Sequence, residues 1–523
     1  MLTPTPCQYC NNSRNYITGE KRFICRPTDP DTCHPCRKVV ELGDKIQKMQ
    51  EAIAEIEKER QQWMVHVNVN HDDLTRRIPP EITAEIFTFY LSEDTLKICM
   101  EFGPSKSYEI KTPLLLSAVS RRWRNIAHAT PELWSKVPLR MWSSNMQSLP
   151  MLAKEWLERS GQYPLSINIF ATDIKSLKSF RELIHVVNQY SSRWKDLKFN
   201  DESSALSHFS SNIEGISNLQ TLCLNAWVSR SGRKGCLNLG KFVLQPRCLV
   251  IEHLSSLDEI TVDWTKLTDL TVQANSGLSL TDCLEVLRRA PQLTTCNLTP
   301  SPSLRNIASL QDSEPILCRH IVNLTLADRN ADRIFDYLIC PSLDTLTISN
   351  LLAGELGIDI GIFLRKSNCS LTTLNVLADT VPLRNVNFIL SCMTISTLCH
   401  LHIEINKPNP SLFRDFFNIL SKSSSQHQPS YLPDLRSLTI HQVSKDCLEW
   451  SSLPRIFNAA GASNRQRREL KCFEFIFGTE SFVTDLVPSM IVDDQTRQEL
   501  LLLKEQGVKL KIQVGENRKV LFE

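Results

Sequence analysis

Two groups of residues in this 523-residue sequence combine side chains and spacing that suit a metal ion. The first group is near the N-terminus, where two Cys-x-x-Cys pairs, Cys7 with Cys10 and Cys33 with Cys36, are separated by 22 residues. Each pair can form a tight knuckle, so the four thiolates would hold a structural zinc ion with no open position for catalysis. Residues 1–38 are otherwise polar and contain several prolines, which equally fits a disordered segment with reduced cysteines. Both interpretations stay open.

The second group lies in the segment LCHLHIEI, where His400, His402 and Glu404 alternate with aliphatic residues. Because alternate side chains of a β-strand point to the same face, all three polar side chains are expected on one face. His441 follows the similar segment LRSLTI and would lie close to Glu404 if the two strands pair in register. Imidazole and carboxylate groups can bind a metal ion or contact a partner protein. Polar residues are also ordinary on an exposed strand face, which is the simplest interpretation of this group.

The sequence contains none of the motifs that usually mark a catalytic site. Glycine-rich nucleotide loops, the G-x-S-x-G nucleophile motif and the H-E-x-x-H zinc motif do not occur. Histidine, aspartate and cysteine residues are scattered, without the spacing that would bring a nucleophile and a base together. We therefore predict that the protein is not an enzyme, and we expect no cofactor beyond the zinc ion that the N-terminal cysteines would hold.

Charge and composition restrict the partners and the compartment. There are 59 Lys and Arg residues against 57 Asp and Glu residues, and the net charge of +2 gives no electrostatic reason to expect nucleic acid or a membrane surface as a partner. The first residues lack the basic and apolar regions of a secretory signal, and no segment approaches the ~18 apolar residues that span a bilayer. Several of the 18 cysteines lie in apolar periodic segments, as expected for small buried side chains in a reducing compartment, the cytoplasm or nucleus.

One pattern returns throughout the region after residue 160. It consists of an aliphatic residue, two variable positions, a second aliphatic, one variable position and a third aliphatic, and we call it the aliphatic template. From Leu270 to Leu401 its middle positions are 22 to 28 residues apart, which is the period of a leucine-rich repeat. The template occurs as LQTLCL (219–224), LDEITV (257–262), LTDLTV (267–272), LTTCNL (293–298), IVNLTL (321–326), LDTLTI (343–348), LTTLNV (371–376), LCHLHI (398–403) and LRSLTI (435–440), with weaker copies in LKCFEF and VKLKI.

The template predicts how the repeats pack. On a strand, its second and third aliphatic residues point into a core shared with the next repeat, and the residue between them points outward. One repeat cannot bury its apolar side alone, so the strands must stack into one long parallel sheet. The predicted fold class is α/β, a leucine-rich repeat solenoid with a curved parallel sheet and outer helices, two of them at 281–290 and 410–420. A doubly wound α/β domain is the alternative, although its strands would be continuous apolar runs. Outward threonines, which β-propensity alone explains, are Thr261, Thr271, Thr325, Thr347 and Thr439.

Residues 39–70 have a heptad pattern. Their apolar residues recur at alternating gaps of three and four, at Val39, Leu42, Ile46, Met49, Ile53 and Ile56. The pattern predicts one amphipathic helix with a narrow apolar seam. The seam would either mediate dimerisation or lie on the neighbouring domain, and the second interpretation is favoured because isolated amphipathic helices of this kind commonly pack on their own chain.

Residues 71–140 contain two further helical segments. In RIPPEITAEIFTFYL (77–91), two prolines suit a helix start, and the pattern places Ile82, Ile86, Phe87 and Tyr90 on one face. In TPLLLSAVSRRWRNIAHATPELWSKV (112–137), a second helix is expected with these residues inward: Leu115, Leu116, Val119, Trp123, Ile126 and Ala127. So small a unit cannot bury all its apolar side chains, and we expect some of them to be available to a partner.

These two segments resemble the F-box of fungal F-box proteins, in which a Leu-Pro-Pro-Glu-Ile helix start is followed by a Val-x-x-x-Trp-Arg-x-Ile-Ala stretch and a Pro-x-Leu-Trp turn. The preceding heptad helix and the following repeats are similar too, so the resemblance covers most of residues 39–523. It departs from the family at Ile78, where leucine is usual, and in the long loop after Leu91. The resemblance implies contacts with a Skp-type adaptor of a cullin-RING ubiquitin ligase through Ile78, Pro79, Ile82, Ile86, Phe87, Leu116, Val119 and Trp123.

The sequence therefore predicts four regions. Residues 1–38 are the cysteine-containing segment, 39–70 the heptad helix, 71–140 the F-box-like domain and 160–523 the leucine-rich repeats. The expected function is that of a substrate receptor, in which the F-box-like domain binds the adaptor and the repeats bind an unidentified target protein. A scaffold that uses the repeats without any ligase is the alternative.

Overall fold

The computed structural model describes residues 34–70, 78–92, 112–141, 145–171, 177–228, 234–273, 276–301, 314–327, 333–350, 360–380, 395–407, 410–422, 431–443, 451, 453–457, 470–477, 493–514 and 520–522. The chain divides into an N-terminal unit, Met1–Phe89, and a C-terminal unit, Tyr90–Glu523. Of the four cysteines predicted to hold zinc, Cys7, Cys10 and Cys33 lie outside the described residues, and only the backbone of Cys36 is described. The zinc prediction therefore stays a prediction.

The N-terminal unit contains the predicted heptad helix. Helix α1 spans His34–Asn70 and begins five residues before the predicted start at residue 39. The described seam residues Leu42, Ile46, Met49, Ile53 and Ile56 are all exposed, between 47% and 64%. The second helix, α3 (Pro80–Ser92), begins in this unit and ends just past its boundary. It starts at the predicted Pro-Pro pair, where the Pro79 carbonyl accepts a hydrogen bond from the Thr83 backbone amide at 3.1 Å. Proline suits this position because the first helical amide needs no partner within the helix.

The C-terminal unit begins with two short helices where one was predicted. Helix α5 spans Pro113–Val119 and α6 spans Arg121–Ala129, and a 3₁₀ turn, η1, follows at Pro131–Trp134. Ser120 separates α5 from α6 because its backbone is extended and its hydroxyl accepts a hydrogen bond from the Trp123 amide at 3.1 Å, which caps α6. The break rotates α5 relative to the predicted pattern, so Leu115 and Val119 are exposed rather than inward.

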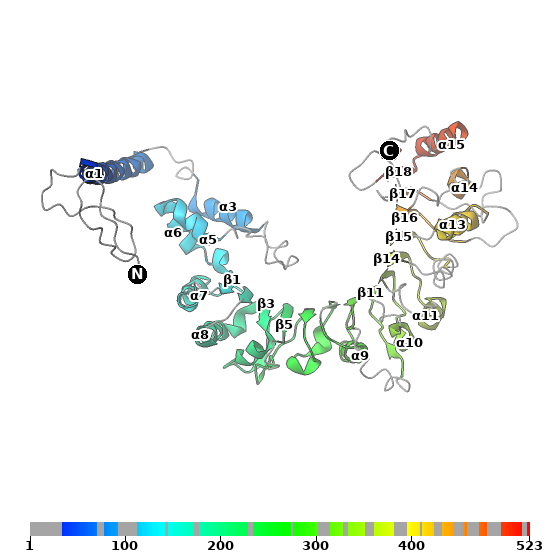
Figure 1. Cartoon of the computed structure of the whole chain (residues 1–523). Helices are drawn as coiled ribbons and strands as arrows, with labels where there is room; N and C mark the ends of the chain where they lie inside the picture. Colours follow the sequence, from blue (N-terminus) through cyan, green and yellow to red (C-terminus); the bar gives the residue numbers. More distant parts are fainter. Residues whose placement is uncertain are drawn as a thin grey trace, which may run out of the picture. The chain divides into compact units, whose positions relative to one another are not determined.

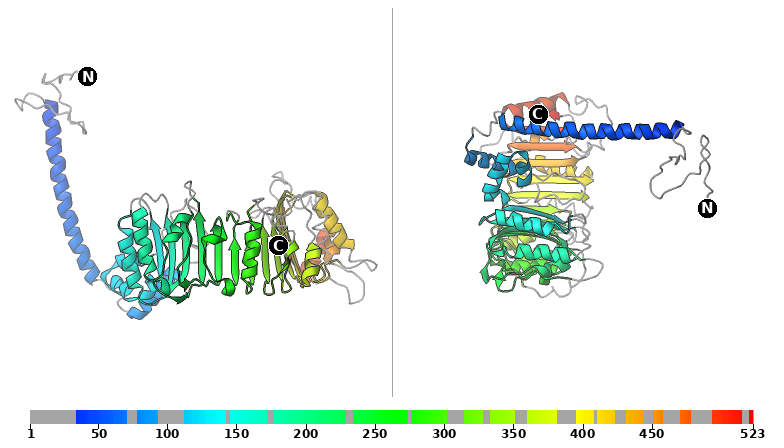
Figure 2. Two further views of the ribbon diagram at one scale, coloured as in Figure 1. Left: turned by 90° about the horizontal axis from the view of Figure 1, so that it is seen from below. Right: turned by 90° about the vertical axis from the view of Figure 1, so that its left-hand side faces the viewer.

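The rest of the C-terminal unit is built on one sheet of 15 strands, in which all but the last run parallel to their neighbours. Figures 1 and 2 show these strands side by side in chain order. The strands are β1 (Lys136–Met141), β2 (Leu165–Ala171), β3 (Trp194–Glu202), β5 (Thr221–Trp227), β7 (Cys248–His253), β8 (Asp269–Val272), β9 (Thr295–Leu298), β11 (Asn323–Ala327), β13 (Thr345–Ser349), β14 (Thr373–Thr380), β15 (His400–Lys407), β16 (Ser437–Val443), β17 (Cys472–Phe477), β18 (Lys509–Val514) and β19 (Val520–Phe522). The predicted α/β class and the long parallel sheet are confirmed.

Helices lie along one side of the stacked strands (Figure 1). They are α7 (Leu149–Arg159), α8 (Leu177–Asn188), α9 (Leu280–Arg289), α10 (Ile334–Tyr337), α11 (Ile360–Ser367), α13 (Pro410–Lys422), α14 (Leu453–Phe457) and α15 (Asp494–Glu505). Shorter connections are η2 (Ser191–Arg193), η3 (Ser203–His208), η4 (Leu257–Glu259) and η5 (Trp264–Lys266), with the small strand pairs β4 (Gly215–Ile216) with β6 (Phe242–Val243) and β10 (Ile316–Leu317) with β12 (Leu338–Ile339). The outer helices predicted at 281–290 and 410–420 are confirmed as α9 and α13.

The middle positions of the aliphatic template form a continuous buried row across the sheet. Neighbouring strands pair in register at Leu197, Leu222, Leu249, Leu270, Cys296, Leu324, Leu346, Leu374, Leu401, Leu438, Phe473 and Leu510. We call this set the inner row, and all its side chains are buried. Phe417 of α13 lies 6.0 Å from Phe475, and Phe457 of α14 lies 5.5 Å from Phe473, so the helices cover the face that carries the inner row.

One predicted template segment is not a strand of the sheet. In LDEITV, residues Leu257–Glu259 form the 3₁₀ turn η4, and Ile260 and Val262 make only isolated bridges to Leu237 and Leu244. The turn starts at Ser256, whose hydroxyl accepts a hydrogen bond from the Asp258 amide. Thr261 is therefore not in the outward row of the sheet. The strand between β5 and β8 is β7 instead, and the sheet begins at β1, before the predicted boundary at residue 160.

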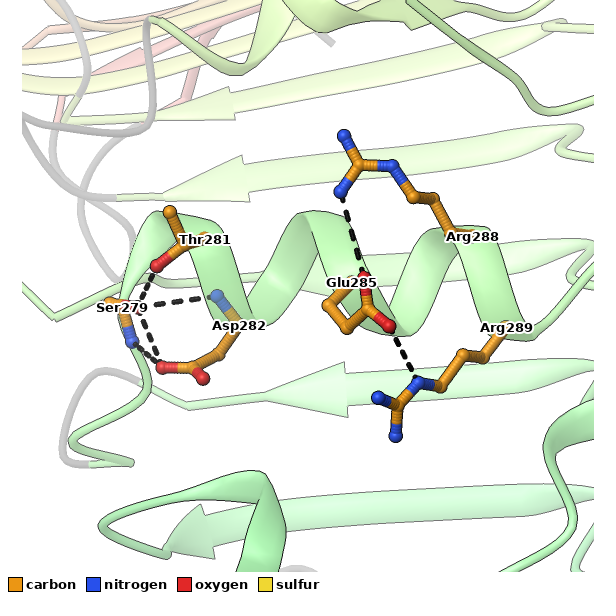
Figure 3. A network of polar contacts seen from close by, with 6 residues as sticks. All are labelled: Ser279, Thr281, Asp282, Glu285, Arg288 and Arg289. Atoms are coloured by element: carbon orange, nitrogen blue, oxygen red, sulfur yellow. Dashed lines mark hydrogen bonds and ion pairs between the residues drawn. The ribbon is translucent and has the colours of Figure 1, made fainter. Parts of the chain in front are cut away.

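Helix α9 shows how the sequence defines an outer helix. Ser279 and Asp282 form a reciprocal capping box, in which the Ser279 hydroxyl accepts from the Asp282 amide at 3.2 Å and the Asp282 carboxylate accepts from the Ser279 amide at 2.8 Å (Figure 3). Near the other end, Glu285 pairs with Arg288 and Arg289 on the exposed side. Arginines in the last turn also suit the negative end of the helix dipole.

No helix among the residues that the structure describes is both long enough and apolar enough to cross a membrane. The longest of them, α1, carries charged residues throughout.

Candidate functional site

Helix α3 exposes part of its apolar face. Ile82 and Ile86, one helical turn apart, are about half exposed, and Phe89 is more exposed still. Pro79 is exposed and Ile78 is half-buried, whereas Phe87 is only 2% exposed. Of the residues predicted to contact an adaptor on this helix, Ile82 and Ile86 are thus accessible and Phe87 is not.

The predicted contact residues of α5 and α6 are also partly exposed and partly buried. Val119 is 61% exposed, and Leu114 and Leu115 on the same helix are exposed as well. Leu116 is buried and Trp123 is partly buried. The Trp134 indole, which is fully buried, donates a hydrogen bond to the Ala127 carbonyl at 2.7 Å and lies 5.1 Å from the Trp156 ring of α7. The turn η1, which ends the helical segment, therefore packs against α7, the first helix after β1.

The face of the sheet that the helices leave open carries a row of mostly polar side chains. We call it the outward row, and register pairing places these residues in it: Asn168, Lys198, Cys223, Val250, Thr271, Asn297, Thr325, Thr347, Asn375, His402, Thr439, Glu474 and Lys511. Four of the five predicted outward threonines are among them. From β8 onward the side chains of this row are partly or fully exposed.

Three residues of β15 and β16 form a compact polar group on this open face. The register pairs Glu404 with His441, which confirms the predicted proximity of these two residues, and it places His402 opposite Thr439. His402 Nε2 and His441 Nδ1 each lie 3.9 Å from the same oxygen, Glu404 Oε2. The two imidazole rings are 5.0 Å apart at 65°. We call this group the His402 cluster.

His400 is outside the His402 cluster. It is paired with Ser437, two residues along the strand from the His402–Thr439 pair, and its side chain is exposed. Among the described residues, His402, Glu404 and His441 are the one group of at least three His, Cys, Asp or Glu side chains close enough to share an ion. The structure thus brings together three of the four residues predicted on this face.

The electrostatics of the cluster favour a neutral imidazole at His402. Burial lowers the pKa of His402, and the neighbouring His441 lowers it further, while Glu404 and Glu474 act in the opposite direction. A neutral imidazole has a lone pair available for a metal ion or a hydrogen-bond donor. The Nε2 atoms of both His402 and His441 are covered by protein and have no hydrogen-bond partner among the described residues.

A second polar group, near the start of the sheet, was not predicted from the sequence. Glu252 of β7 is buried and accepts a hydrogen bond from Asn225 Nδ2 at 3.1 Å; burial raises its pKa, and Lys198 opposes this effect. Asp201 of β3 is also buried, and burial raises its pKa to about 7. One carboxylate oxygen of Asp201 accepts the Glu202 amide at 2.7 Å, and the other has no partner among the described residues. For Glu252, its position directly after the aliphatic run LVI is the only signal in the sequence, and the polar segment around Asp201 gives none.

Comparison of the sequence with protein-family models and with curated proteins found no match. The function is therefore inferred from the open sheet face and from the short N-terminal helices.

Proposed function

We propose that the protein is a non-catalytic F-box adaptor, in which residues 78–134 bind a Skp-type subunit of a cullin-RING ubiquitin ligase and the leucine-rich repeat sheet holds a target protein. The observation that supports the docking half is the exposure of Ile82, Ile86 and Val119, which belong to the F-box-like pattern of the sequence. A contiguous patch of exposed apolar side chains on a soluble protein usually marks a site where a partner binds.

The exposure pattern also refines which residues would meet the adaptor. Ile82 and Ile86 on α3, and Val119 on α5, are available for direct contact. Phe87 and Leu116 are buried within the chain, so in this proposal they support the helices from inside. The direct energetic contribution is therefore expected from the three aliphatic residues that water reaches.

The open sheet face is suited to bind a protein target. The outward row extends across the parallel strands from β2 to β18, and from β8 onward it carries amide, hydroxyl, imidazole and charged groups. Such a face gives many hydrogen-bonding positions at fixed spacing on a rigid support. In the proposed complex, the F-box-like segment binds the ligase while the sheet binds the target, which raises the effective concentration of the target near the ligase. Ubiquitin transfer itself is catalysed by the ubiquitin-conjugating enzyme.

Co-purification of the full chain with a Skp-type adaptor tests this function. We expect the wild-type chain to co-elute, and a triple variant, Ile82→Asp, Ile86→Asp and Val119→Asp, to weaken binding at least ~100-fold, because charges would replace the apolar contacts. Met151→Asp on α7, an exposed apolar position outside the proposed interface, is the matched control and should bind normally. Failure of the wild-type chain to bind, or equal binding by the triple variant, would refute the docking half.

A ligase-independent scaffold is the second candidate. The contact between Trp134 and Trp156 favours it, because it joins the helical segment to the first coil of the sheet, as a capping element of a repeat array would require. In that case no Skp-type adaptor binds, and the Trp134→Ala variant lowers the stability of the sheet while leaving a target interaction on the open face intact.

A further inference from the structure

We propose that His402, Glu404 and His441 bind one divalent transition-metal ion, such as Zn²⁺, on the open face of the sheet. This site is independent of the proposed ligase function, because it needs only the two strands that carry its ligands. It would be a regulatory or target-binding site rather than part of the sheet core.

The sheet holds the three side chains in positions that suit one ion. His402 and Glu404 are two residues apart on β15, so they share a face, and His441 is directly opposite Glu404 on β16. A zinc ion ~2.1 Å from each ligand atom keeps those atoms about 3.4 Å apart. The His402 and His441 nitrogens are each 3.9 Å from Glu404 Oε2, so each of these two pairs must close by about half an ångström, and all three ligand atoms lie within 4.8 Å of one another. Small side-chain rotations suffice, and the backbone can stay as it is.

The chemistry of the three ligands selects the kind of ion. Two imidazoles and one carboxylate form the ligand set of many open zinc sites and of 2-His-1-carboxylate iron sites. Ca²⁺ and Mg²⁺ prefer oxygen ligands and would be poorly held by a group with two nitrogens. The carboxylate of Glu404 contributes a negative charge that attracts a cation. Glu474, on the next strand, is already paired with Lys511 at 2.6 Å.

A cluster of ordinary polar surface residues would leave fewer atoms without partners. The distances of 3.9 Å within the cluster are too long for hydrogen bonds, yet the Nε2 atom of each histidine is covered by protein and has no hydrogen-bond partner among the described residues. Covered polar atoms without partners are uncommon and costly. A metal ion held by the cluster would satisfy the lone pair of His402 that faces Glu404.

The position of the cluster gives the site an open coordination position. The side chains of His402, Glu404 and His441 are 32%, 36% and 21% exposed, so an ion bound to them would be reached from the open face. Three protein ligands leave a tetrahedral ion with one position for water or for a side chain of a bound protein. A histidine, cysteine or carboxylate from that protein would complete the coordination.

The experiment uses the full chain with Cys7, Cys10, Cys33 and Cys36 all changed to serine, so that any ion bound by these thiolates is removed from the measurement. After treatment with a chelator and its removal, the protein is titrated with Co²⁺, followed by visible d–d absorbance, and with Zn²⁺, followed by calorimetry and by thermal unfolding. We expect one ion per chain, absorbance typical of nitrogen and oxygen ligands, and a rise in the unfolding temperature with Zn²⁺.

Matched variants locate the site. His402→Thr, Glu404→Gln and His441→Thr should each weaken binding by at least ~10-fold and remove the zinc-dependent rise in unfolding temperature. Threonine is used because it already occupies the outward row at Thr347 and Thr439, so the fold should tolerate it. His400→Thr, on the same strand but outside the cluster, should bind as the parent does. The proposal is overturned if the parent binds neither ion, or if the three ligand variants bind as tightly as His400→Thr.

Discussion

Two regions of this molecule have apolar residues at a regular interval, and they differ in what covers those residues. In the inner row of the sheet, Leu324, Leu346 and Leu374 are buried because each lies against its counterpart on the next strand. In α1, the seam residues from Leu42 to Ile56 are about half exposed. The comparison shows that periodicity identifies the apolar face of an element, whereas burial depends on whether the chain provides a second copy of that face next to it.

The largest effect is expected in the inner row. Leu346→Ala should lower the free energy of unfolding by about 3 kcal/mol, because it leaves a cavity between two fully paired strands and their outer helices. The measurement is urea unfolding followed by circular dichroism. Thr325→Ala, on the outward side of the adjacent strand, is the control and should cost less than about 1 kcal/mol. Equal losses for the two variants would mean that the inner row is not the main source of stability.

The second prediction concerns the pH dependence of stability caused by Asp201, an acidic residue at an inward-pointing position of β3. Asp201 lies on the same side of its strand as Leu197 and Phe199 and is buried, which raises its pKa to about 7 from a usual value of 3.8. At about pH 3 and below, this carboxyl is mostly protonated in the folded and the unfolded chain alike, so it has almost no effect on stability. As the pH rises to about 7 the unfolded chain loses the proton first, and the stability of the fold decreases until the carboxyl also ionises in the folded state.

Asp201→Asn should therefore raise the free energy of unfolding by about 2 kcal/mol at pH 8 and leave it nearly unchanged at about pH 3. Thermal or urea unfolding at the two pH values provides the measurement. Asp336→Asn, on the exposed side of α10, should show no such pH dependence. A gain that is the same at both pH values would contradict the assigned cause.

The smallest effect on unfolding is expected in the α1 seam. The seam residues from Leu42 to Ile56 are exposed, so a second copy of the helix can cover them. β-Branched residues occupy one seam position at Val39, Ile46 and Ile53, which suits pairing of two helices. We expect the wild-type chain to form a dimer through α1, and Ile46→Lys with Ile53→Lys to make it monomeric with less than about 0.5 kcal/mol change in the unfolding of the sheet. Light scattering of the eluted protein measures the mass. A monomeric wild-type chain would show that the seam does not join two copies.

The sequence predicted most of the sheet because the aliphatic template is a direct consequence of strand geometry. It failed where another residue occupies the first position of the template: Trp134 before β1, Pro164 before β2, Trp194 at the start of β3 and Pro246 before β7. These residues begin a strand as well as leucine does, but a search for aliphatic residues passes over them. In LDEITV the pattern was present, yet the cap at Ser256 started a 3₁₀ turn.

The open-face site was partly predictable for the same geometric reason. When two strands share a template, aligning the templates aligns the register, and this places His441 against Glu404. The burial of Asp201 and Glu252 was not predictable, because it depends on what three or four neighbouring strands place around each carboxyl. The division of α5 from α6 was also missed, since a serine within a helical pattern gives no sign of whether it will continue the helix or cap the next one.

The last strand changes how the sheet could associate with other molecules. A stack of parallel strands ends in a row of backbone amides and carbonyls to which another chain can add, and repeated addition leads to polymers. Here β19 runs antiparallel to β18 and pairs with it at Ile512 and Gln513. Because β19 is only three residues long, it offers few backbone groups to a second molecule, which disfavours end-to-end addition at this edge.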